Sequence, residues 1–287
     1  MMPVAPLTPS RSRFARRLAR ISLRIVAILA ALLLALPFIV PWFIFRPEPL
    51  DASDPGRWGL PQAQAITFAA DDNILTGWWL EAPDEERPVI LIAHGRSANM
   101  AKRASIAARL SRDGFGVLMF DYRGYGGSQG SPTEAGIETD ALAAYDWLRT
   151  QGIAAKRIIL VGQSLGGAPA ARVAAERPVR GLVLVSPYTN LPEAAAWSYP
   201  WLPLAWIPWP RNRFEVAARL KERNIPIALI ASRSDGLVPL GNSEELARTL
   251  KRSPIWVMLD PVGHDGLLTA AAERGLLSQA LREVASR

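Results

Sequence analysis

The stretch IILVGQSLGGAPAAR, residues 158–172, places a serine between two different sequence patterns. The apolar run before Gly162 predicts a buried strand, and the Ala-rich run after Gly167 predicts a helix. Glycines on both sides of Ser164 allow a sharp turn, which would hold the serine hydroxyl clear of the sheet. The alternative interpretation is an ordinary tight turn that needs a small residue.

The same turn supplies a backbone donor. Leu165 follows Ser164, so its N–H would lie at the start of the predicted helix, where unpaired donors and the helix dipole favour a developing oxyanion. A serine hydroxyl is a weak nucleophile unless a histidine takes its proton and a carboxylate orients that histidine. The chain contains two histidines, His94 and His264.

Both histidines and a candidate acid follow predicted strands, at the ends where ligands bind in open α/β sheets. His264 lies in DPVGHDG, beyond the last predicted strand, and Asp235 lies in ASRSDGLVP after the strand before it. In the chain, Asp235 follows the serine and His264 follows Asp235. Asp260 and Asp265 remain alternatives as the orienting acid. His94, in LIAHGRSAN, is interpreted as a structural histidine that braces its loop.

Around the serine, apolar runs alternate with helical patterns. This rhythm predicts an α/β fold with a mainly parallel eight-stranded sheet flanked by helices, whose first two strands form an antiparallel hairpin. The predicted strands cover residues 65–70, 75–81, 88–93, 116–121, 157–162, 181–186, 226–231 and 254–259. The predicted helices cover residues 99–112, 134–151, 164–176, 242–251 and 266–284.

One segment, residues 188–213, breaks the rhythm and is predicted to be a small Trp/Pro-rich cap inserted in the domain. Its tryptophans either bury one face of a lid or form an apolar acyl-chain pocket or a membrane-facing belt. They are Trp197, Trp201, Trp206 and Trp209.

Basic charge is concentrated at the N-terminus. Of the 33 lysines and arginines, seven lie in residues 1–46, which hold no acid, and the remaining 26 equal the 26 acidic residues. The net charge of +7 therefore does not indicate a nucleic-acid-binding body. Residues 25–45, IVAILAALLLALPFIVPWFIF, carry no charge. As a helix they would span about 30 Å, the thickness of a bilayer core, and are predicted to be a transmembrane helix.

Charge asymmetry predicts the topology of that helix. Residues 1–24 are basic and would stay in the cytoplasm, which places the rest of the chain on the non-cytoplasmic side. A cleaved signal peptide is the alternative; the long apolar stretch and the missing cleavage motif favour an uncleaved signal anchor. Residues 46–62, rich in Pro, Asp and Gly, are predicted to be a linker, and residues 63–287 the globular domain.

Composition also limits the chemistry. The chain has no cysteine, which excludes disulfides and thiol-based metal or redox sites. Two histidines are too few for most His-rich metal sites. We expect no metal and no organic cofactor.

From about residue 63 to 284 the chain resembles the α/β-hydrolase family, and is most similar to its membrane-anchored serine hydrolases with one N-terminal span. The segments AHGRSAN, FDYRGYGGSQG, GQSLGG, SPYTNL, SRSDGLVP and GHDG carry this resemblance in order. It implies that Ser164 is the nucleophile, His264 the base and Asp235 the orienting acid. It also implies that the Arg96 N–H is the second oxyanion donor, beside that of Leu165.

Arg96 departs from the family pattern, in which a small polar residue often follows the His-Gly pair. Its backbone donor survives the change, whereas its side chain would either crowd the site or attract an anionic group. The loop DYRGYGGS, residues 121–128, is expected to be rigid, with local hydrogen bonds from Asp121 and a structural Arg123.

The resemblance implies cleavage of an ester or related acyl bond in a small-molecule or lipid substrate, through an acyl-enzyme and without a nucleic-acid partner. Two alternatives remain. One is a peptidase or amidase that uses the same three residues. The other is a membrane-tethered binding module that keeps the fold without turnover.

Overall fold

The structure, a computed structural model, describes residues 11–198, 200–201 and 212–287. Contacts divide the chain into two units, Met1–Ile44 and Phe45–Arg287. The first unit contains helix α1, Arg11–Ile44. Within the described part of the chain, no helix combines the length and the hydropathy needed to cross a bilayer. In the predicted span, residues 30 and 33–43 lie outside the part whose side chains are described.

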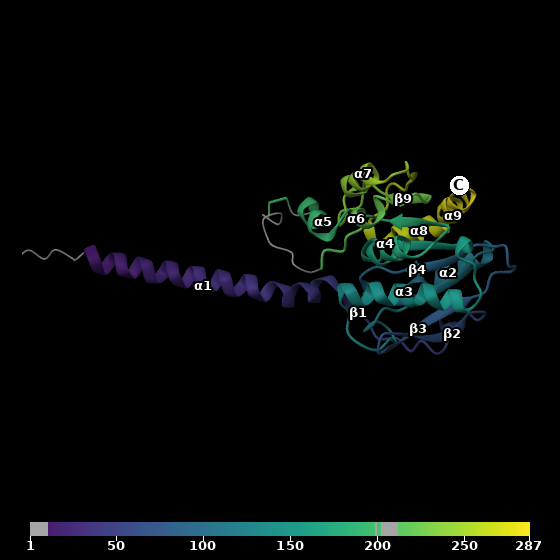
Figure 1. The fold of residues 1–287 in the computed structure, drawn as a ribbon, viewed down its shortest axis with the longest axis horizontal. Coiled ribbons are helices and arrows are strands. Elements are labelled where there is room, and N and C mark those ends of the chain that lie inside the picture. Colours follow the sequence, from purple (N-terminus) through teal and green to yellow (C-terminus); the bar gives the residue numbers. More distant parts are fainter. Residues whose placement is uncertain (1–10, 199, 202–211) are drawn as a thin grey trace, which may run out of the picture. The chain divides into compact units, whose positions relative to one another are not determined.

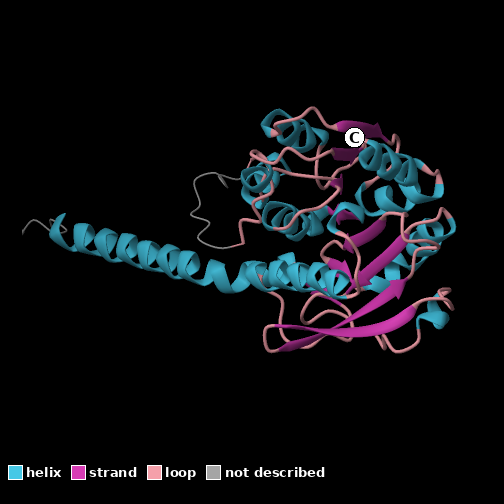
Figure 2. Ribbon diagram, turned by 45° about the vertical axis from the view of Figure 1, so that its right-hand side comes forward, coloured by secondary structure: helices cyan, strands magenta, loops and turns pink. Residues whose placement is uncertain are grey.

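Eight strands form the sheet of the second unit (Figures 1 and 2). They are β2 Gln64–Ala70, β3 Asn73–Leu80, β4 Val89–Ala93, β6 Gly116–Phe120, β7 Ile158–Gln163, β8 Gly181–Val185, β9 Ile227–Ala231 and β10 Ile255–Met258. Their order is β10-β9-β8-β7-β4-β6-β3-β2. Strand β3 is antiparallel to β2 and β6, and the other neighbours are parallel. The predicted sheet and its hairpin are confirmed.

The central strands are buried along their whole length, which explains why their sequences are continuous apolar runs. Every residue of β4, β6, β7, β8 and β9 is buried. Parallel strands have this pattern when helices cover both faces of the sheet. Strand β2, at the edge, buries only Phe68 and Ala70.

Two groups of helices cover the sheet (Figure 2). Helices α2 Ala104–Arg112, α8 Leu267–Glu273 and α9 Leu276–Ser286 pack together over one face. Helices α3 Glu134–Thr150 and α4 Gly167–Glu176 pack over the other face, and α6 Ala217–Leu220 lies on α4. Helix α7 Leu240–Thr249 contacts β9, α6 and α5 Leu191–Ser198.

Several helix boundaries differ from the prediction. The helix predicted over residues 266–284 is two helices, because Gly275 adopts a φ of 74° and ends the first. The helices predicted at 99–112 and 164–176 begin as 3-10 turns, η2 Met100–Arg103 and η4 Ser164–Gly166. Helices α5 and α6 were not predicted.

The segment 46–62 was predicted to be a linker, but the structure corrects this. It belongs to the same unit as the sheet. Strand β1, Arg46–Pro47, pairs in parallel with β5, Ser97–Ala98, and Leu60 is fully buried. Its Pro- and Gly-rich composition does produce irregular backbone. A single buried leucine, however, leaves no periodic signal in a sequence.

The predicted cap lies partly outside the described residues. Helix α5 forms its beginning, and Trp197 and Trp201 are exposed. The Trp197 ring lies close against Gly241 of α7. Residues 199 and 202–211, which include Trp206 and Trp209, are outside the described part.

Candidate active site

Ser164 occupies a strained turn between β7 and α4. Its φ is 50°, a left-handed conformation that costs a non-glycine residue roughly 1–2 kcal/mol. The flanking glycines are required by close backbone contacts. A Cβ on Gly166 would lie 2.1 Å from the Ala93 carbonyl oxygen, and one on Gly162 would lie 2.8 Å from the Gly166 carbonyl oxygen. The turn is therefore pressed against the end of β4.

The structure brings Ser164, His264 and Asp235 into one chain of hydrogen bonds. The Ser164 hydroxyl lies 3.0 Å from His264 Nε2. On the other side of the ring, Nδ1 lies 2.9 Å and 3.1 Å from the two Asp235 carboxylate oxygens. The histidine comes from η6, His264–Gly266, in the connection after β10. The grouping expected from the sequence is present.

Asp235 is held as an anion. It is buried, and the backbone amides of Leu237 and Val238 donate to its Oδ1 at 3.0 Å and 2.8 Å. Burial by itself raises the pKa of this carboxyl. The hydrogen bonds from His264 and Val238 outweigh that effect, and the pKa lies below its usual value. An ionised Asp235 favours the His264 tautomer with hydrogen on Nδ1, which leaves Nε2 to accept the serine proton.

The two alternative acids do not hold the histidine. Asp260 accepts hydrogen bonds from the Ser232 hydroxyl at 3.0 Å and from the Arg233 amide at 2.7 Å. It also forms an ion pair with the Arg233 guanidinium at 2.6 Å. Asp265 is the next residue after His264, but the Nδ1 of that ring is directed to Asp235.

His94 has the structural position that was predicted for it. Its Nδ1 donates to the Gly95 carbonyl oxygen at 2.7 Å, and its Nε2 lies 3.6 Å from Asp121 Oδ1. Burial lowers the pKa of His94 to about 3, so the ring is neutral. The Tyr122 hydroxyl donates to the His94 carbonyl oxygen at 3.0 Å.

The loop of residues 95–99 passes directly beside the serine. A Cβ built on Gly95 would lie 3.8 Å from the Ser164 Cβ. The Arg96 carbonyl oxygen accepts hydrogen bonds from the Arg46 amide at 3.0 Å and the Tyr125 hydroxyl at 2.7 Å. Strand β1 therefore holds the loop through the bond from the Arg46 amide. Leu165, the other predicted donor, lies in the first turn of η4, where amides lack an intrahelical acceptor.

The 121–128 loop differs from the expectation in one respect. The Asp121 carbonyl oxygen accepts locally from the Ser128 hydroxyl at 2.7 Å, as expected, but its side chain accepts from the distant Met100 amide at 2.6 Å. Burial raises the pKa of this carboxyl to about 7. Arg123 has the predicted structural role, with ion pairs to Asp140 at 2.7 Å and to Asp71 at 3.0 Å.

Sequence reasoning missed Arg103, whose guanidinium reaches Gln163, the residue before the serine, at 3.1 Å. The two residues are 60 positions apart and share no motif, so no sequence signal joins them. Among the described residues, no cluster of three or more His, Asp or Glu side chains is arranged to hold a metal.

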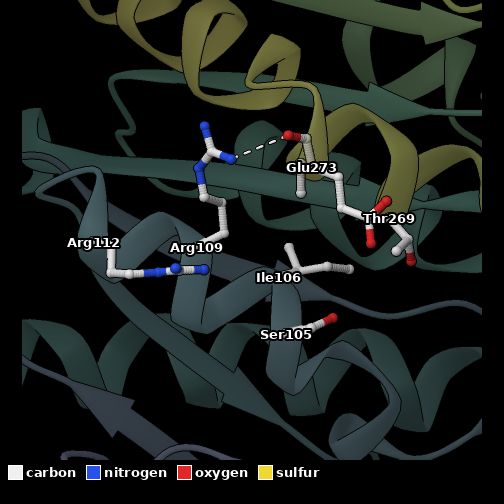
Figure 3. Close-up of a pocket in the computed structure, with 7 residues that line it drawn as sticks. Ser105, Ile106, Arg109, Arg112, Thr269 and Glu273 are labelled. Atoms are coloured by element: carbon white, nitrogen blue, oxygen red, sulfur yellow. Dashed lines mark hydrogen bonds between the residues drawn. The ribbon is translucent and has the colours of Figure 1, made fainter.

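A pocket of about 210 Å³ lies between α2 and α8 (Figure 3). Arg109 bridges these helices, donating to the Glu273 carbonyl oxygen at 3.1 Å. The lining residues include none of the serine, histidine and aspartate described above; they are Ser105, Ile106, Arg109, Arg112, Thr269, Ala272 and Glu273.

Comparison with known proteins places the chain in a family. A family model described as alpha/beta hydrolase fold matches residues 88–209. An uncharacterized protein of Mycobacterium tuberculosis is 36% identical over 209 residues, covering 72% of this chain and 74% of that protein. The chain belongs to the α/β-hydrolase family.

Other similar proteins have names that describe hydrolases. A lysophosphatidylserine lipase of Danio rerio is 29% identical over 239 residues, which cover 72% of this α/β-hydrolase and 62% of the lipase. An esterase of Pyrococcus furiosus has the same fold, with a TM-score of 0.66 at 20% identity over 84% of this chain and 98% of its own. An alpha-beta hydrolase of Vibrio vulnificus has a TM-score of 0.63 at 25% identity, covering 78% of this chain and 81% of its own. The esterase shows the fold, and the lipase and the Vibrio vulnificus hydrolase support assignment of the chain as a hydrolase.

Proposed function

We propose that this α/β-hydrolase is a serine hydrolase, anchored in a membrane by residues 25–45, that cleaves an ester or related acyl bond. The observation that carries the proposal is the hydrogen-bonded chain from Ser164 Oγ through the His264 ring to Asp235. A nucleophile, a base within hydrogen-bond reach and an acid that orients the base are the parts that acyl transfer to serine requires.

In the first half-reaction, Ser164 Oγ attacks the acyl carbonyl carbon while its proton passes to His264 Nε2. The 3.0 Å separation lies within the reach of a general base. Asp235 stays ionised and stabilises the imidazolium through its Nδ1–H. The tetrahedral intermediate then collapses as His264 gives its proton to the leaving group, and the acyl group remains on the serine oxygen.

In the second half-reaction, a water molecule attacks the acyl carbon and His264 accepts its proton. Collapse of this second intermediate returns the proton to Ser164 Oγ and releases the carboxylic acid. In both intermediates the negative oxygen would be stabilised by the backbone N–H groups of Leu165 and Arg96. Apart from the attacking water, the groups that act in these steps are side chains and amides of this chain.

The substrate class is an acyl group in a small molecule or a lipid. The name of the Danio rerio relative, a lysophosphatidylserine lipase, supports a lipid ester. A chain tethered at a bilayer would meet such a substrate at the membrane surface. The uncharged residues 25–45, preceded by six arginines and no acid, support the anchor and a cytoplasmic N-terminus.

Turnover of p-nitrophenyl esters of increasing chain length tests the proposal. Ser164→Ala should lower kcat by about 10³-fold or more, because the nucleophile is lost. Ser105→Ala, which shortens an exposed serine of α2, is the matched control and should leave kcat unchanged. Equal ester hydrolysis by the wild type and by folded Ser164→Ala would refute the mechanism.

A further inference from the structure

The guanidinium of Arg103 joins two segments that are distant in the sequence. Its Nη1 donates to the carbonyl oxygens of Ser97 and Asn99 at 3.2 Å and 3.3 Å. Its Nε and Nη2 donate to the side-chain oxygen of Gln163 at 3.3 Å and 3.1 Å. One planar group, with five donors in fixed directions, therefore connects the 95–99 loop to the last residue of β7.

Both connected segments border the candidate nucleophile. Gln163 immediately precedes Ser164 and is buried. A Cβ built on Gly95 would lie 3.6 Å from Arg103 Nη2, 3.8 Å from the Ser164 Cβ and 3.4 Å from the Gln163 carbonyl oxygen. The guanidinium, the loop and the serine turn thus pack around this glycine without an intervening side chain.

These contacts hold a largely buried cation with neutral oxygens. Among the ion pairs of the described residues, none includes Arg103. Burial lowers the pKa of this guanidinium below its usual range. Burying a cation is costly, and an apolar side chain would fill the space at lower cost. What the arginine supplies is a set of directed bonds. The titratable groups that face it are His94, Asp121, Tyr122, Tyr125 and Asp265.

We propose that Arg103 is a positioning residue: it fixes the loop that carries the Arg96 amide against the turn that carries Ser164. The inference rests on the proposed function, because it gives the Arg96 N–H a role at the oxyanion. Arg103 acts through the loop and does not touch the substrate. Its contribution is to keep the two oxyanion donors at a set separation, since a misplacement of about 1 Å costs up to about 10²-fold in rate.

The test compares two methionine variants of the full chain. Arg103→Met keeps most of the stem and removes all donors; Arg112→Met does the same at an exposed arginine that bonds to Ala108 of its own helix. We expect Arg103→Met to lower kcat for p-nitrophenyl acetate by about 10- to 100-fold with KM nearly unchanged, since the contact acts on the oxyanion. Arg112→Met should match the wild type.

Gln163→Met provides a second test if Arg103→Met folds poorly, because it removes the bonds between Arg103 and Gln163 and leaves those from Arg103 to the loop carbonyls. We expect it to lower kcat as well, and the double variant to be no more than about 2-fold slower than Arg103→Met, because that single change already removes the bonds to Gln163. Wild-type kcat in folded Arg103→Met, or a loss confined to KM, would overturn the proposal.

Amide hydrogen exchange of the 95–99 loop separates this inference from the proposed function. Arg103→Met should exchange faster in this loop than Arg112→Met, because the loop loses its fastening. Unchanged exchange would overturn the positioning role, whatever the activity. If the wild type shows no Ser164-dependent hydrolysis, the proposed function fails, and exchange still decides whether Arg103 holds the loop.

Discussion

Ser164 combines the reactive group of the site with its backbone strain. A φ of 50° at a serine persists only where the surroundings enforce it, and such strain is concentrated at functional sites. Here the enforcement comes from Gly162 and Gly166, where the turn meets the end of β4. The sequence predicted this turn correctly, since the glycine spacing and the change from strand to helix are local features.

Other features of single residues could be identified only from distances in the structure. Asp235 and Asp260 both follow predicted strands; the sequence favoured Asp235 as the orienting acid but left Asp260 and Asp265 as alternatives. Which carboxylate orients the histidine depends on the path of the loop after β10. This loop brings His264 to Asp235, while Asp260 forms an ion pair with Arg233. The contact of Arg103 with Gln163 is also non-local, so neither the sequence around Arg103 nor the sequence around Gln163 indicates it.

Asp121 gives the stability of the protein a pH dependence. The pKa of its carboxyl is raised by burial to about 7 in the folded state, against about 3.9 in an unfolded chain. The folded state therefore binds more protons between these values, so the free energy of unfolding should fall as pH rises from about 4 to 7 and level off above.

Asp121→Asn isolates this effect. The amide oxygen can still accept from the Met100 N–H, but the side chain no longer ionises. Urea unfolding of the wild type and the variant between about pH 4.5 and 8 should show that the variant lacks part of the decrease. Parallel curves would mean that Asp121 does not titrate in this range.

At the scale of elements, the strands were predictable because the sheet is mostly parallel and covered on both faces. Runs such as β4 and β8 are apolar at every position, and the intervening helical patterns separate them clearly. The packing of residues 46–62 against the domain could not be predicted in this way. The role of this segment depends on backbone pairing with β5 and on the burial of Leu60, and neither leaves a repeat in the sequence.

The role of residues 46–62 can be tested by comparing two shortened chains, one with this segment and one without it. A chain of residues 45–287 keeps the bond from the Arg46 amide to the Arg96 carbonyl and the bond from Trp78 to the Ala52 carbonyl, whereas residues 63–287 lack both. We expect the longer chain to leave the membrane fraction and keep ester hydrolysis, and the shorter one to lose hydrolysis.

Arg46→Pro and Arg46→Ala in the full chain provide the finer control. Both variants lose the arginine side chain; the proline also lacks the amide donor to the loop and has a fixed φ, whereas the alanine keeps that donor. Lower kcat in the proline variant alone is expected. If the 63–287 chain hydrolyses esters as fast as the 45–287 chain, the segment has no part in the site.

At the scale of the whole molecule, charge and hydropathy divide the chain into a basic, apolar N-terminal segment and a neutral body. The excess of basic residues lies in the first 46 residues, while the remainder has equal numbers of acids and bases. A neutral hydrolase body with a basic, apolar N-terminal segment suits a protein that works on acyl groups at a membrane surface. The family and the fold follow from the body of the chain, and the anchor is proposed from residues 25–45.

Reaction of the full chain with a fluorescent fluorophosphonate, followed by mapping of the modified peptide by mass spectrometry, tests whether Ser164 is an activated nucleophile. Such a probe reacts with serines that a neighbouring base activates. We expect one adduct, on Ser164, which is absent from Ser164→Ala and strongly reduced in His264→Ala. A folded wild type that takes up no probe, or an adduct on another serine, would contradict it.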